Sequence, residues 1–372
     1  MITRIDITNN GAIGKASLVF EKGRYKYLEN LTQEGLANPI AVYGRNGSGK
    51  SSLINALFAL VCLLVDDKDK LTPFIMNISR LADTEVNSKP LDENDLISSM
   101  TIYFTIEEKE FIYSIATDFE SIVDESLFAG GMQVFKRVMG TLSYKGETRS
   151  IEENFYPSLR DLSNESSSDE NDVSKAYGFL SNIACVSSID KYRAKTIGKK
   201  NNMDAIVDYS AEIKGIIKRY GSFPVYDVES ELSQEGKKRY YIQLEKSNRK
   251  AIRLPFEFAS EGMVQQSFLL SILLSLPENG VLVVDEIERA LHPLTIANFL
   301  KVVNEKHIQL IFTSHNTNIL SHLRPDNIFF AYWKDGYSNF KRLSNLYENI
   351  REVNNIEKMY LSATFDSAIE GE

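Results

Sequence analysis

The sequence is poor in cysteine, and it has neither a long hydrophobic run nor an excess of positive charge. Two cysteines, Cys62 and Cys185, occur among its 372 residues, and both lie in apolar stretches. This pattern predicts buried free thiols in a reducing compartment rather than a disulfide framework. The apolar stretch Val264–Leu276 is too short and too interrupted by polar residues to span a bilayer. The N-terminus lacks the apolar core of a signal peptide. We therefore expect a soluble cytoplasmic protein with no membrane partner.

Charge and composition narrow the class further. Hydrophobic residues make up 43% of the chain and charged residues 25%, as in soluble globular proteins. The net charge of −9 argues against non-specific nucleic-acid binding by the whole surface, although it leaves room for a local basic patch. The length suits one large domain or two modest ones. No internal repeat and no extended coiled-coil heptad pattern is visible.

The most informative stretch is Gly44–Ser51, with the sequence GRNGSGKS. It matches the P-loop pattern G-x-x-x-x-G-K-[ST], and the flanking residues predict a buried strand over Pro39–Tyr43 and a helix over Lys50–Leu64. Glycines let backbone N–H groups surround a phosphate chain, and the helix N-terminus adds positive potential. The alternative is a glycine-rich turn before a helix that binds no nucleotide. The four fixed positions of the pattern would recur by chance in about one chain in a hundred of this length.

The P-loop assigns roles to its residues. Lys50 is expected to bridge the β- and γ-phosphates, and the Ser51 hydroxyl is expected to hold Mg²⁺. The predicted nucleotide-binding residues of this loop are Gly44, Asn46, Gly47, Ser48, Gly49, Lys50, Ser51 and Ser52.

A second informative stretch begins at Ser260-Glu261-Gly262, which precedes an apolar helix expected over Met263–Leu276. Val281–Val284 is a continuous apolar run typical of a buried parallel strand, and Asp285 and Glu286 follow it. Parallel sheets bind ligands at this end of their strands. Asp285 is therefore expected to hold Mg²⁺ through water, and Glu286 to accept a proton from the water that attacks the γ-phosphate. Simple polar capping of a strand end is the alternative.

A third polar group stands at the end of another predicted strand, Ile308–Thr313, which is followed by Ser314 and His315. A lone histidine in this position more often has a structural role. Because three such groups share one edge of the presumed sheet, we expect a hydrogen bond from His315 to the γ-phosphate.

The remaining pattern is mixed α/β. It predicts strands over Ile2–Thr8, Ala16–Phe20, Met100–Ile106, Phe111–Ala116, Tyr240–Leu244 and Ala251–Leu254. It predicts a helix over Ala205–Tyr220 and a hairpin of Asn327–Trp333 with Ser338–Leu343. The acidic, serine-rich stretch Leu162–Ser174 predicts a mobile loop.

The order of these motifs resembles the ABC-type ATPase heads, and most of all their SMC/RecF-like branch, whose soluble bacterial members are often labelled AAA ATPases. The resemblance places Lys50 and Ser51 in the Walker A motif, Asp285 and Glu286 in the Walker B pair, and His315 at the switch histidine. It covers residues 1–60 and 251–345, whereas residues 60–250 carry no motif that matches.

The resemblance implies the fold class: α/β, a P-loop NTPase of ABC-ATPase head type, with a mixed sheet, an antiparallel β lobe and an inserted helical lobe. We expect one composite ATPase domain. Residues 1–130 form the ABC ATPase lobe with Walker A, 131–250 form an inserted helical and β region, and 251–372 hold the signature helix, Walker B, the switch histidine and the C-terminal tail.

Ser260, Glu261 and Gly262 stand at the position of the ABC signature, whose serine and backbone amides reach the γ-phosphate bound by the other protomer. The local sequence is SEGMVQ rather than LSGGQ, and IERALHP follows Asp-Glu; both features resemble the soluble branch. The resemblance therefore implies ATP and Mg²⁺ as cofactors and a homodimer or higher oligomer that forms with ATP. It also implies an ATPase whose catalytic residues are Lys50, Glu286 and His315.

Two family positions stay open. No Q-loop glutamine can be placed. Tyr25 or Tyr27 is a candidate for stacking on adenine, although a tyrosine on a solvent-facing strand edge is the better interpretation.

Compact ATPases of this kind resemble sensor or regulator components of bacterial anti-phage and abortive-infection systems. There a neighbouring gene supplies the effector, often a TOPRIM-type or HNH nuclease or a toxin. The tail sequence KMYLSATFDSAIE resembles that of stand-alone ATPases encoded beside RloB-like partners. No nuclease is evident in this chain itself. The 57 residues after His315 contain no Asp-x-Asp pair, and the four histidines all lie in the last third of the sequence.

Two other functions are consistent with the sequence. A RecF-like ATPase in DNA repair or recombination would bind DNA through a basic stripe, for which the candidates are Arg193–Lys200, Lys237–Arg239, Arg249 and Lys250. A solvated loop explains each cluster equally well. A generic ATP-driven protein with a protein partner and no nucleic acid is the third possibility.

His292 in Leu-His-Pro either approaches the partner protomer or begins a helix with Pro293.

Overall fold

One mixed sheet runs through most of the chain. The computed structural model describes residues 1–65, 97–118, 121–151, 156–166, 171–190, 193–197, 203–220, 225–245, 251–291, 293–347, 350 and 354–365. Within these ranges fifteen strands form one sheet. In sheet order they are β11 (Glu147–Ser150), β10 (Thr141–Tyr144), β9 (Met132–Val138), β8 (Ile122–Ala129), β7 (Lys109–Thr117), β6 (Ser98–Ile106), β1 (Ile2–Asn10), β2 (Ile13–Val19), β20 (Tyr337–Arg342), β19 (Ile328–Lys334), β5 (Ile40–Tyr43), β18 (Gln309–Thr313), β17 (Val281–Val284), β12 (Ala184–Asp190) and β13 (Arg193–Ile197).

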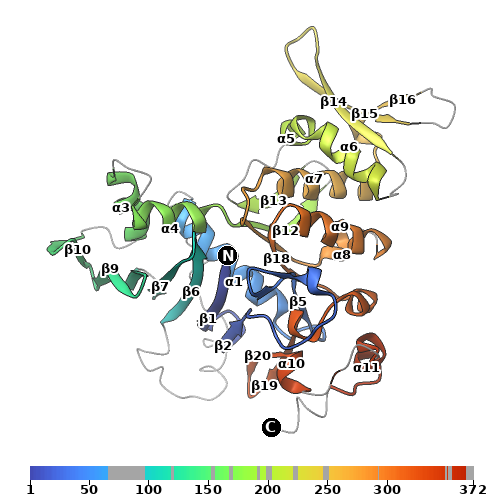
Figure 1. Ribbon diagram of the computed structural model, residues 1–372. Coiled ribbons are helices and arrows are strands. Elements are labelled where there is room, and N and C mark those ends of the chain that lie inside the picture. Colours follow the sequence, from blue (N-terminus) through green and yellow to red (C-terminus); the bar gives the residue numbers. More distant parts are fainter. Residues whose placement is uncertain are drawn as a thin grey trace.

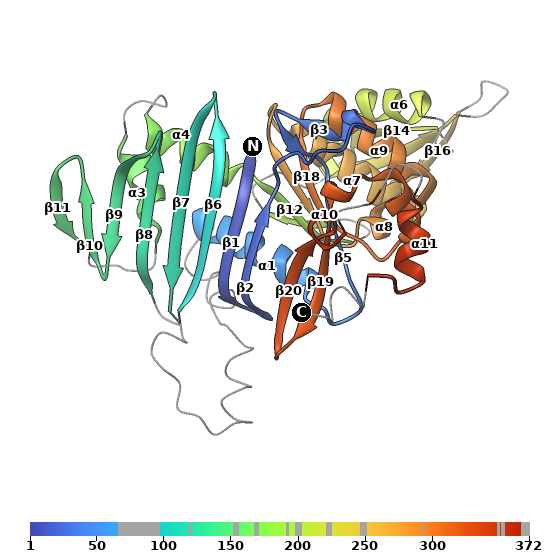
Figure 2. The ribbon, with the colours of Figure 1, turned by 60° about the horizontal axis from the view of Figure 1, so that its bottom comes forward.

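The sheet has an antiparallel wing and a parallel centre. Strands β11 to β6, with β1 and β2, pair antiparallel and stand side by side in Figure 2. Strands β19, β5, β18, β17 and β12 pair parallel. In β6 and β7 every second residue is buried, as expected for a sheet with one covered face. In β5, β17 and β18 every residue is buried, because helices cover both faces there.

Helices form the layers on the two faces of the parallel centre (Figures 1 and 2). The helix α1 (Lys50–Val65) and the helix α4 (Asp172–Ser181) share one hydrophobic core with the antiparallel wing. The helices α7 (Glu261–Ser275), α9 (Pro293–Glu305) and α11 (Ile356–Leu361) share the other core. Within β5, Ile40 and Val42 enter the first core and Ala41 and Tyr43 the second, which is the two-residue period of a strand.

Smaller elements complete the fold. The helices are α3 (Ser158–Glu165), α5 (Met203–Asp208), α6 (Ser210–Arg219), α8 (Ile287–Ala290) and α10 (Leu343–Leu346). The 3-10 helices are η1 (Glu29–Leu31), η4 (Phe256–Phe258), η5 (Thr317–His322) and η6 (Pro325–Asn327). The remaining strands are β3 (Thr32–Gln33) and β4 (Leu36–Ala37), which pair with each other, and β14 (Tyr226–Leu232), β15 (Lys238–Leu244) and β16 (Ile252–Pro255), which form a separate sheet beside α5 and α6 (Figure 1).

The structure confirms the α/β mixed-sheet fold class and most predicted elements. Strands and helices occur where the sequence predicts β1, β2, β5, β6, β7, α1, α7, β15 to β20 and the final hairpin. Cys62 and Cys185 are both buried and free, as predicted. Among the helices that the structure describes, none is long and apolar enough to cross a membrane.

Two predicted elements are wrong. The loop expected over Leu162–Ser174 is helical at both ends, since α3 continues to Glu165 and α4 begins at Asp172. Leu159 and Leu162 bury one side of α3, and the Asn171 side chain caps α4 by accepting a hydrogen bond from Ser174 N at 2.8 Å. Residues 167–170 of that stretch lie outside the described residues.

The single helix expected over Ala205–Tyr220 is two helices, α5 and α6, that meet at Tyr209. Ser210 opens the second helix, and its hydroxyl oxygen accepts a hydrogen bond from Val228 N of β14 at 2.7 Å. This hydrogen bond attaches the start of α6 to the neighbouring sheet. Tertiary structure therefore overrides the helical periodicity, which predicted one continuous helix.

Candidate nucleotide site

The P-loop joins the buried strand β5 to the helix α1 in six residues, 44–49. Its three glycines have positive φ values of 157° (Gly44), 78° (Gly47) and 92° (Gly49). A Cβ atom at Gly49 would overlap Ser338 of β20, and one at Gly44 would overlap the Ala331 carbonyl of β19. The loop therefore presses against the β19–β20 hairpin so closely that only glycine fits at these two positions.

Lys50 lies inside this loop. Its Nζ donates hydrogen bonds to the carbonyls of Gly44 at 2.8 Å and Arg45 at 3.1 Å. Burial lowers the pKa of Lys50, while the nearby carboxylates of Asp285 and Glu286 act in the opposite direction. The cation is therefore held at the loop and faces the acids that end β17.

The other predicted loop residues surround Lys50. Asn46 and Gly47 are exposed. Ser52 lies in α1, and its N–H donates to Gly49 O at 3.0 Å. Ser48 is buried, and its hydroxyl has no hydrogen-bond partner in the part of the chain that the structure describes. Because a buried hydroxyl without a partner is costly, this atom fits a ligand that supplies hydrogen-bond acceptors, such as a phosphate oxygen.

Ser51 and Asp285 come together although they are distant in sequence. Ser51 Oγ lies 3.3 Å from Asp285 Oδ1, and Thr313 Oγ1 donates a hydrogen bond to the same carboxylate oxygen. Asp285 N donates to Val186 O of β12 at 2.9 Å. A hydroxyl and a carboxylate are hard oxygen donors that suit Mg²⁺, which takes few protein ligands when it also binds phosphate. Accordingly, the described residues contain no group of three or more acidic, histidine or cysteine side chains that would hold a metal unaided.

Glu286 and His315 also meet at this edge of the sheet. His315 Nε2 lies 3.8 Å from Glu286 Oε1, and Glu286 forms a close ion pair with Arg289 of α8. Glu286 has left-handed backbone angles of φ 48° and ψ 63°, and its N–H donates to Thr313 Oγ1 at 2.8 Å. Strain of this kind in a non-glycine residue is concentrated at functional sites.

Glu288 was missed by the sequence analysis. Its carboxylate accepts hydrogen bonds from Ser314 Oγ at 2.8 Å and from the backbone N–H of His315 at 2.6 Å. Tyr43 at the end of β5 donates to Asn316 O in the same segment at 2.9 Å. The only signal in the sequence was a third acid two residues after Asp-Glu, which spacing alone does not connect to the strand that precedes His315.

The signature residues lie at the start of α7. Ser260 caps this helix, with Oγ accepting from Met263 N at 3.4 Å, and Glu261 Oε1 accepts from Gln265 Nε2 at 3.0 Å. Ser260, Glu261 and Gly262 are all exposed. Their side-chain hydrogen bonds stay within the first turn of α7, so these residues present a free helix N-terminus to the outside.

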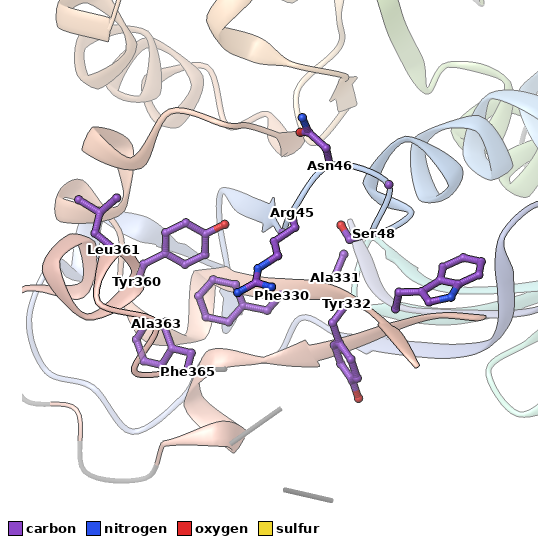
Figure 3. A pocket seen from close by; sticks show the side chains of 13 residues that line it. Arg45, Asn46, Ser48, Phe330, Ala331, Tyr332, Tyr360, Leu361, Ala363 and Phe365 are labelled. Atoms are coloured by element: carbon purple, nitrogen blue, oxygen red, sulfur yellow. The ribbon is translucent and has the colours of Figure 1, made fainter. Parts of the chain in front are cut away.

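A cavity of about 620 Å³ lies beside the P-loop (Figure 3). One wall is the loop itself, Gly44–Ser48, and the other walls come from β19 and the C-terminal segment around α11. The apolar and aromatic lining residues are Phe330, Ala331, Tyr332, Trp333, Tyr360, Leu361, Ala363 and Phe365. Neither Tyr25 nor Tyr27 lines this cavity; their rings pack edge to face on each other, with centroids 5.9 Å apart.

The basic clusters are partly neutralised. Lys238 pairs with Asp204 at 2.7 Å, and Lys237 lies 3.9 Å from Glu235. Arg249, Lys250 and His292, as well as residues 198–200, lie outside the described residues. The side chains that are described therefore give little support to a continuous basic stripe.

The chain is similar to one protein family and to solved structures of known fold. Residues 143–321 match a family model described as "AAA domain, putative AbiEii toxin, Type IV TA system". A solved SMC head bound to the C-winged helix domain of ScpA is 15% identical, with 91% of this chain and 96% of that chain covered and a TM-score of 0.50. An SMC head domain from Thermotoga maritima is 16% identical, with 92% and 98% covered and a TM-score of 0.47. No curated protein sequence matches the chain.

The fold comparison rests on the first of these structures. The protein has the fold of an ABC-type P-loop ATPase head, as the sequence motifs predicted. Within that class its fold is similar to that of the SMC heads, and its residues 143–321 match the AAA family model.

Proposed function

We propose that this protein is a molecular switch that binds and hydrolyses ATP and dimerises on ATP. In this proposal it is the sensor or regulator ATPase of a bacterial anti-phage defence system and controls a separately encoded effector, such as a nuclease or toxin. The observation that carries the ATPase proposal is the convergence of Lys50, Ser51, Asp285, Glu286 and His315 at the C-terminal edge of one parallel sheet.

Each group has a role in the proposed reaction. The P-loop amides and Lys50 bind the phosphates, and Ser51 and Asp285 are the residues that would hold Mg²⁺, which supplies charge neutralisation when bound. Glu286 accepts a proton from the attacking water, whose oxygen bonds to the γ-phosphorus as the bond to the β–γ bridging oxygen breaks and ADP leaves. His315 donates a hydrogen bond to a γ-phosphate oxygen. Glu286 is paired with Arg289 in this structure, so catalysis requires that this pair opens.

The exposed start of α7 supports the dimer. Ser260, Glu261 and Gly262 lie at the N-terminus of a helix of fifteen residues, where backbone N–H groups and the helix dipole favour an anion. In the proposed switch this terminus faces the γ-phosphate held by a second protomer. ATP then links two heads, and hydrolysis releases them, since the nucleotide interacts differently with the open and closed assemblies.

The family description supports the defence role. The model that matches residues 143–321 is named after an AbiEii toxin and a Type IV TA system. The cytoplasm is the proposed location.

The decisive experiment uses Glu286→Gln, which keeps the shape of the side chain but removes the base. Hydrolysis should slow by about 10²–10⁴-fold while ATP binding survives, so the variant should accumulate as an ATP-loaded dimer. Hydrolysis at the wild-type rate would show that Glu286 is not the base. Arg289→Gln is the matched control, because it frees the carboxylate without removing it and should not reproduce the loss.

The same variant tests the biological role. We would isolate ATP-loaded Glu286→Gln from its native host and identify bound proteins by mass spectrometry and bound nucleic acid by a direct assay. A nuclease-like or toxin-like protein held only with ATP supports the defence switch. Nucleic acid without a protein partner contradicts it and favours a RecF-like role in DNA repair.

A further inference from the structure

An aromatic side chain projects into solvent two residues before Ser260. The 3-10 helix η4 buries Phe256, which is 2% exposed, and presents Phe258, which is 73% exposed. Phe256 packs in the core that contains α7, so the position of η4 is fixed relative to the signature residues. A single exposed aromatic needs no explanation by itself. It becomes informative when a complementary hollow exists at the place it would meet.

The cavity beside the P-loop is such a hollow. Its base contains Phe330 and Phe365, each 2% exposed, and its rim contains Trp333 and Leu361, which are 55% and 66% exposed. Phe330 stacks on Tyr360, with ring centroids 5.4 Å apart (Figure 3). An aromatic-walled cavity of about 620 Å³ has room for one more phenyl ring.

The charges around the two features are opposite. Glu257 and Glu261, on either side of Phe258, are exposed. Arg45 is exposed at the tip of the P-loop and lines the cavity, and in Figure 3 its side chain extends toward Phe330. Phe258, with acidic residues on either side, is therefore complementary in charge to the aromatic cavity that Arg45 lines. This complementarity favours contact between these two surfaces.

We propose that Phe258 of one protomer inserts into the cavity beside the P-loop of a second copy of this chain. This inference rests on the proposed function, in which Ser260 approaches the partner's P-loop. Two residues of extended chain span about 7 Å. Asn46 and Gly47 belong to the P-loop and also line the cavity, so in a dimer that brings Ser260 to the loop the cavity is within reach of Phe258.

The contact is isologous. Each protomer carries both the projecting ring and the cavity, so the two-fold operation that makes one contact makes a second. Two buried aromatic anchors then supplement the nucleotide in closing the dimer. The walls that receive the ring include Tyr360 and Leu361, so insertion also contacts the C-terminal segment.

Cysteine cross-linking tests the contact directly. The two native cysteines are buried, so introduced thiols are the accessible ones. We would combine Glu257→Cys, beside the retained Phe258, with Leu361→Cys in the Glu286→Gln background. The expected result is a disulfide-linked dimer that forms with ATP and not without nucleotide. Glu257→Cys with Met132→Cys, whose side chain is 72% exposed on the distant β9, is the control pair.

A second variant separates the possible failures. Phe258→Ala should weaken the ATP-dependent dimer by about 30-fold or more, measured by sedimentation, while the ATP affinity of the monomer stays unchanged. Leu232→Ala, at a side chain 67% exposed on β14, should change neither quantity. An ATP-dependent dimer without the 257–361 cross-link and without sensitivity to Phe258→Ala overturns this contact alone. Absence of any ATP-dependent dimer overturns both the contact and the proposed switch.

Discussion

At the scale of single residues, the centre of the site is a set of hydrogen bonds around the ends of β17 and β18. Thr313 contacts both acids, since its hydroxyl donates to Asp285 and accepts from Glu286 N. Glu288 then fixes the segment that follows β18. The two strand ends are therefore held as one unit, in which the proposed metal ligand, the proposed base and His315 keep a common geometry.

Lys50→Ala should abolish measurable ATP binding. Lys50 is buried and donates two hydrogen bonds to loop carbonyls, so its ammonium group lies within the loop that is proposed to bind the phosphates. Fluorescent-nucleotide titration measures the loss, with the exposed Lys145→Ala as control. Tight ATP binding by Lys50→Ala would contradict the nucleotide site.

Glu288→Gln should lower kcat by about 10- to 100-fold with little change in KM, because the amide cannot accept both hydrogen bonds that position His315. We therefore regard Glu288 as a positioning residue. Steady-state kinetics with a thermal melt distinguish this from general destabilisation, and Glu235→Gln serves as an exposed control. A wild-type kcat would show that Ser314 and His315 need no such support.

At the scale of elements, the antiparallel wing is stabilised by a buried ionic cluster. Glu125 of β8 accepts hydrogen bonds from Ser158 N at 2.6 Å, Leu159 N at 3.0 Å and Tyr113 Oη at 2.9 Å, and it lies 3.7 Å from Arg137. Burial raises the pKa of Glu125, while these donors lower it. One carboxylate thereby satisfies the first N–H groups of α3 and fixes that helix to the sheet.

Glu125→Ala should destabilise the protein by about 3–5 kcal/mol, because it leaves Arg137 buried without its carboxylate. Denaturant unfolding measures this change. Glu165→Ala is the control: Glu165 pairs with Arg149 on the surface, where both side chains are about half exposed, and its removal should cost at most about 1 kcal/mol. Equal effects of the two substitutions would contradict the assignment.

The elements that the sequence predicted best are those whose burial is visible locally. The continuous apolar runs of β5, β17 and β18 predicted a parallel sheet covered on both faces, and the glycine spacing predicted the P-loop. The helix break at Tyr209 was not predicted, because it depends on the hydrogen bond between Ser210 and β14. The ends of α3 and α4 were not predicted either, because their acidic and serine-rich residues are typical of a loop. The roles of Glu288 and of the aromatic cavity were not predicted, because the first depends on α8 meeting the end of β18 and the second on the P-loop, β19 and the segment around α11 coming together.

At the scale of the whole molecule, the two ends of the sequence complete one sheet. Gln309 at the start of β18 exchanges hydrogen bonds with the backbone of Ile2, each at 2.7 Å. The side chain of Asn38 reaches Leu310 N at 2.9 Å and Ile308 O at 2.8 Å. The buried pair of Arg324 and Asp326 fixes the segment around Gly23 in the same way. These contacts connect the N-terminal strand and the segment before β5 to β18 and η6.

The ATPase rate per protomer should rise with protein concentration, because the proposed site is complete only in a dimer. The rate should reach a plateau above the dissociation constant of the dimer, and Phe258→Ala should move the midpoint to higher concentration. Measurements over about a 100-fold range of concentration test this. A constant rate per protomer, in a sample that sedimentation shows to be monomeric, would mean that one head suffices.

The position of β5 has a consequence for synthesis of the protein. Ile40 pairs with Ile311 of β18, and Ala41 pairs with Ile328 of β19, so the strand that carries the P-loop has no neighbour until most of the chain exists. A ribosome that adds about 5–20 residues per second needs roughly 15–50 s to make the residues in between. Products of interrupted translation therefore carry the P-loop sequence without the sheet that shapes it. When translation is interrupted in a cell, incomplete copies of this protein would therefore lack a formed nucleotide site and would be inactive.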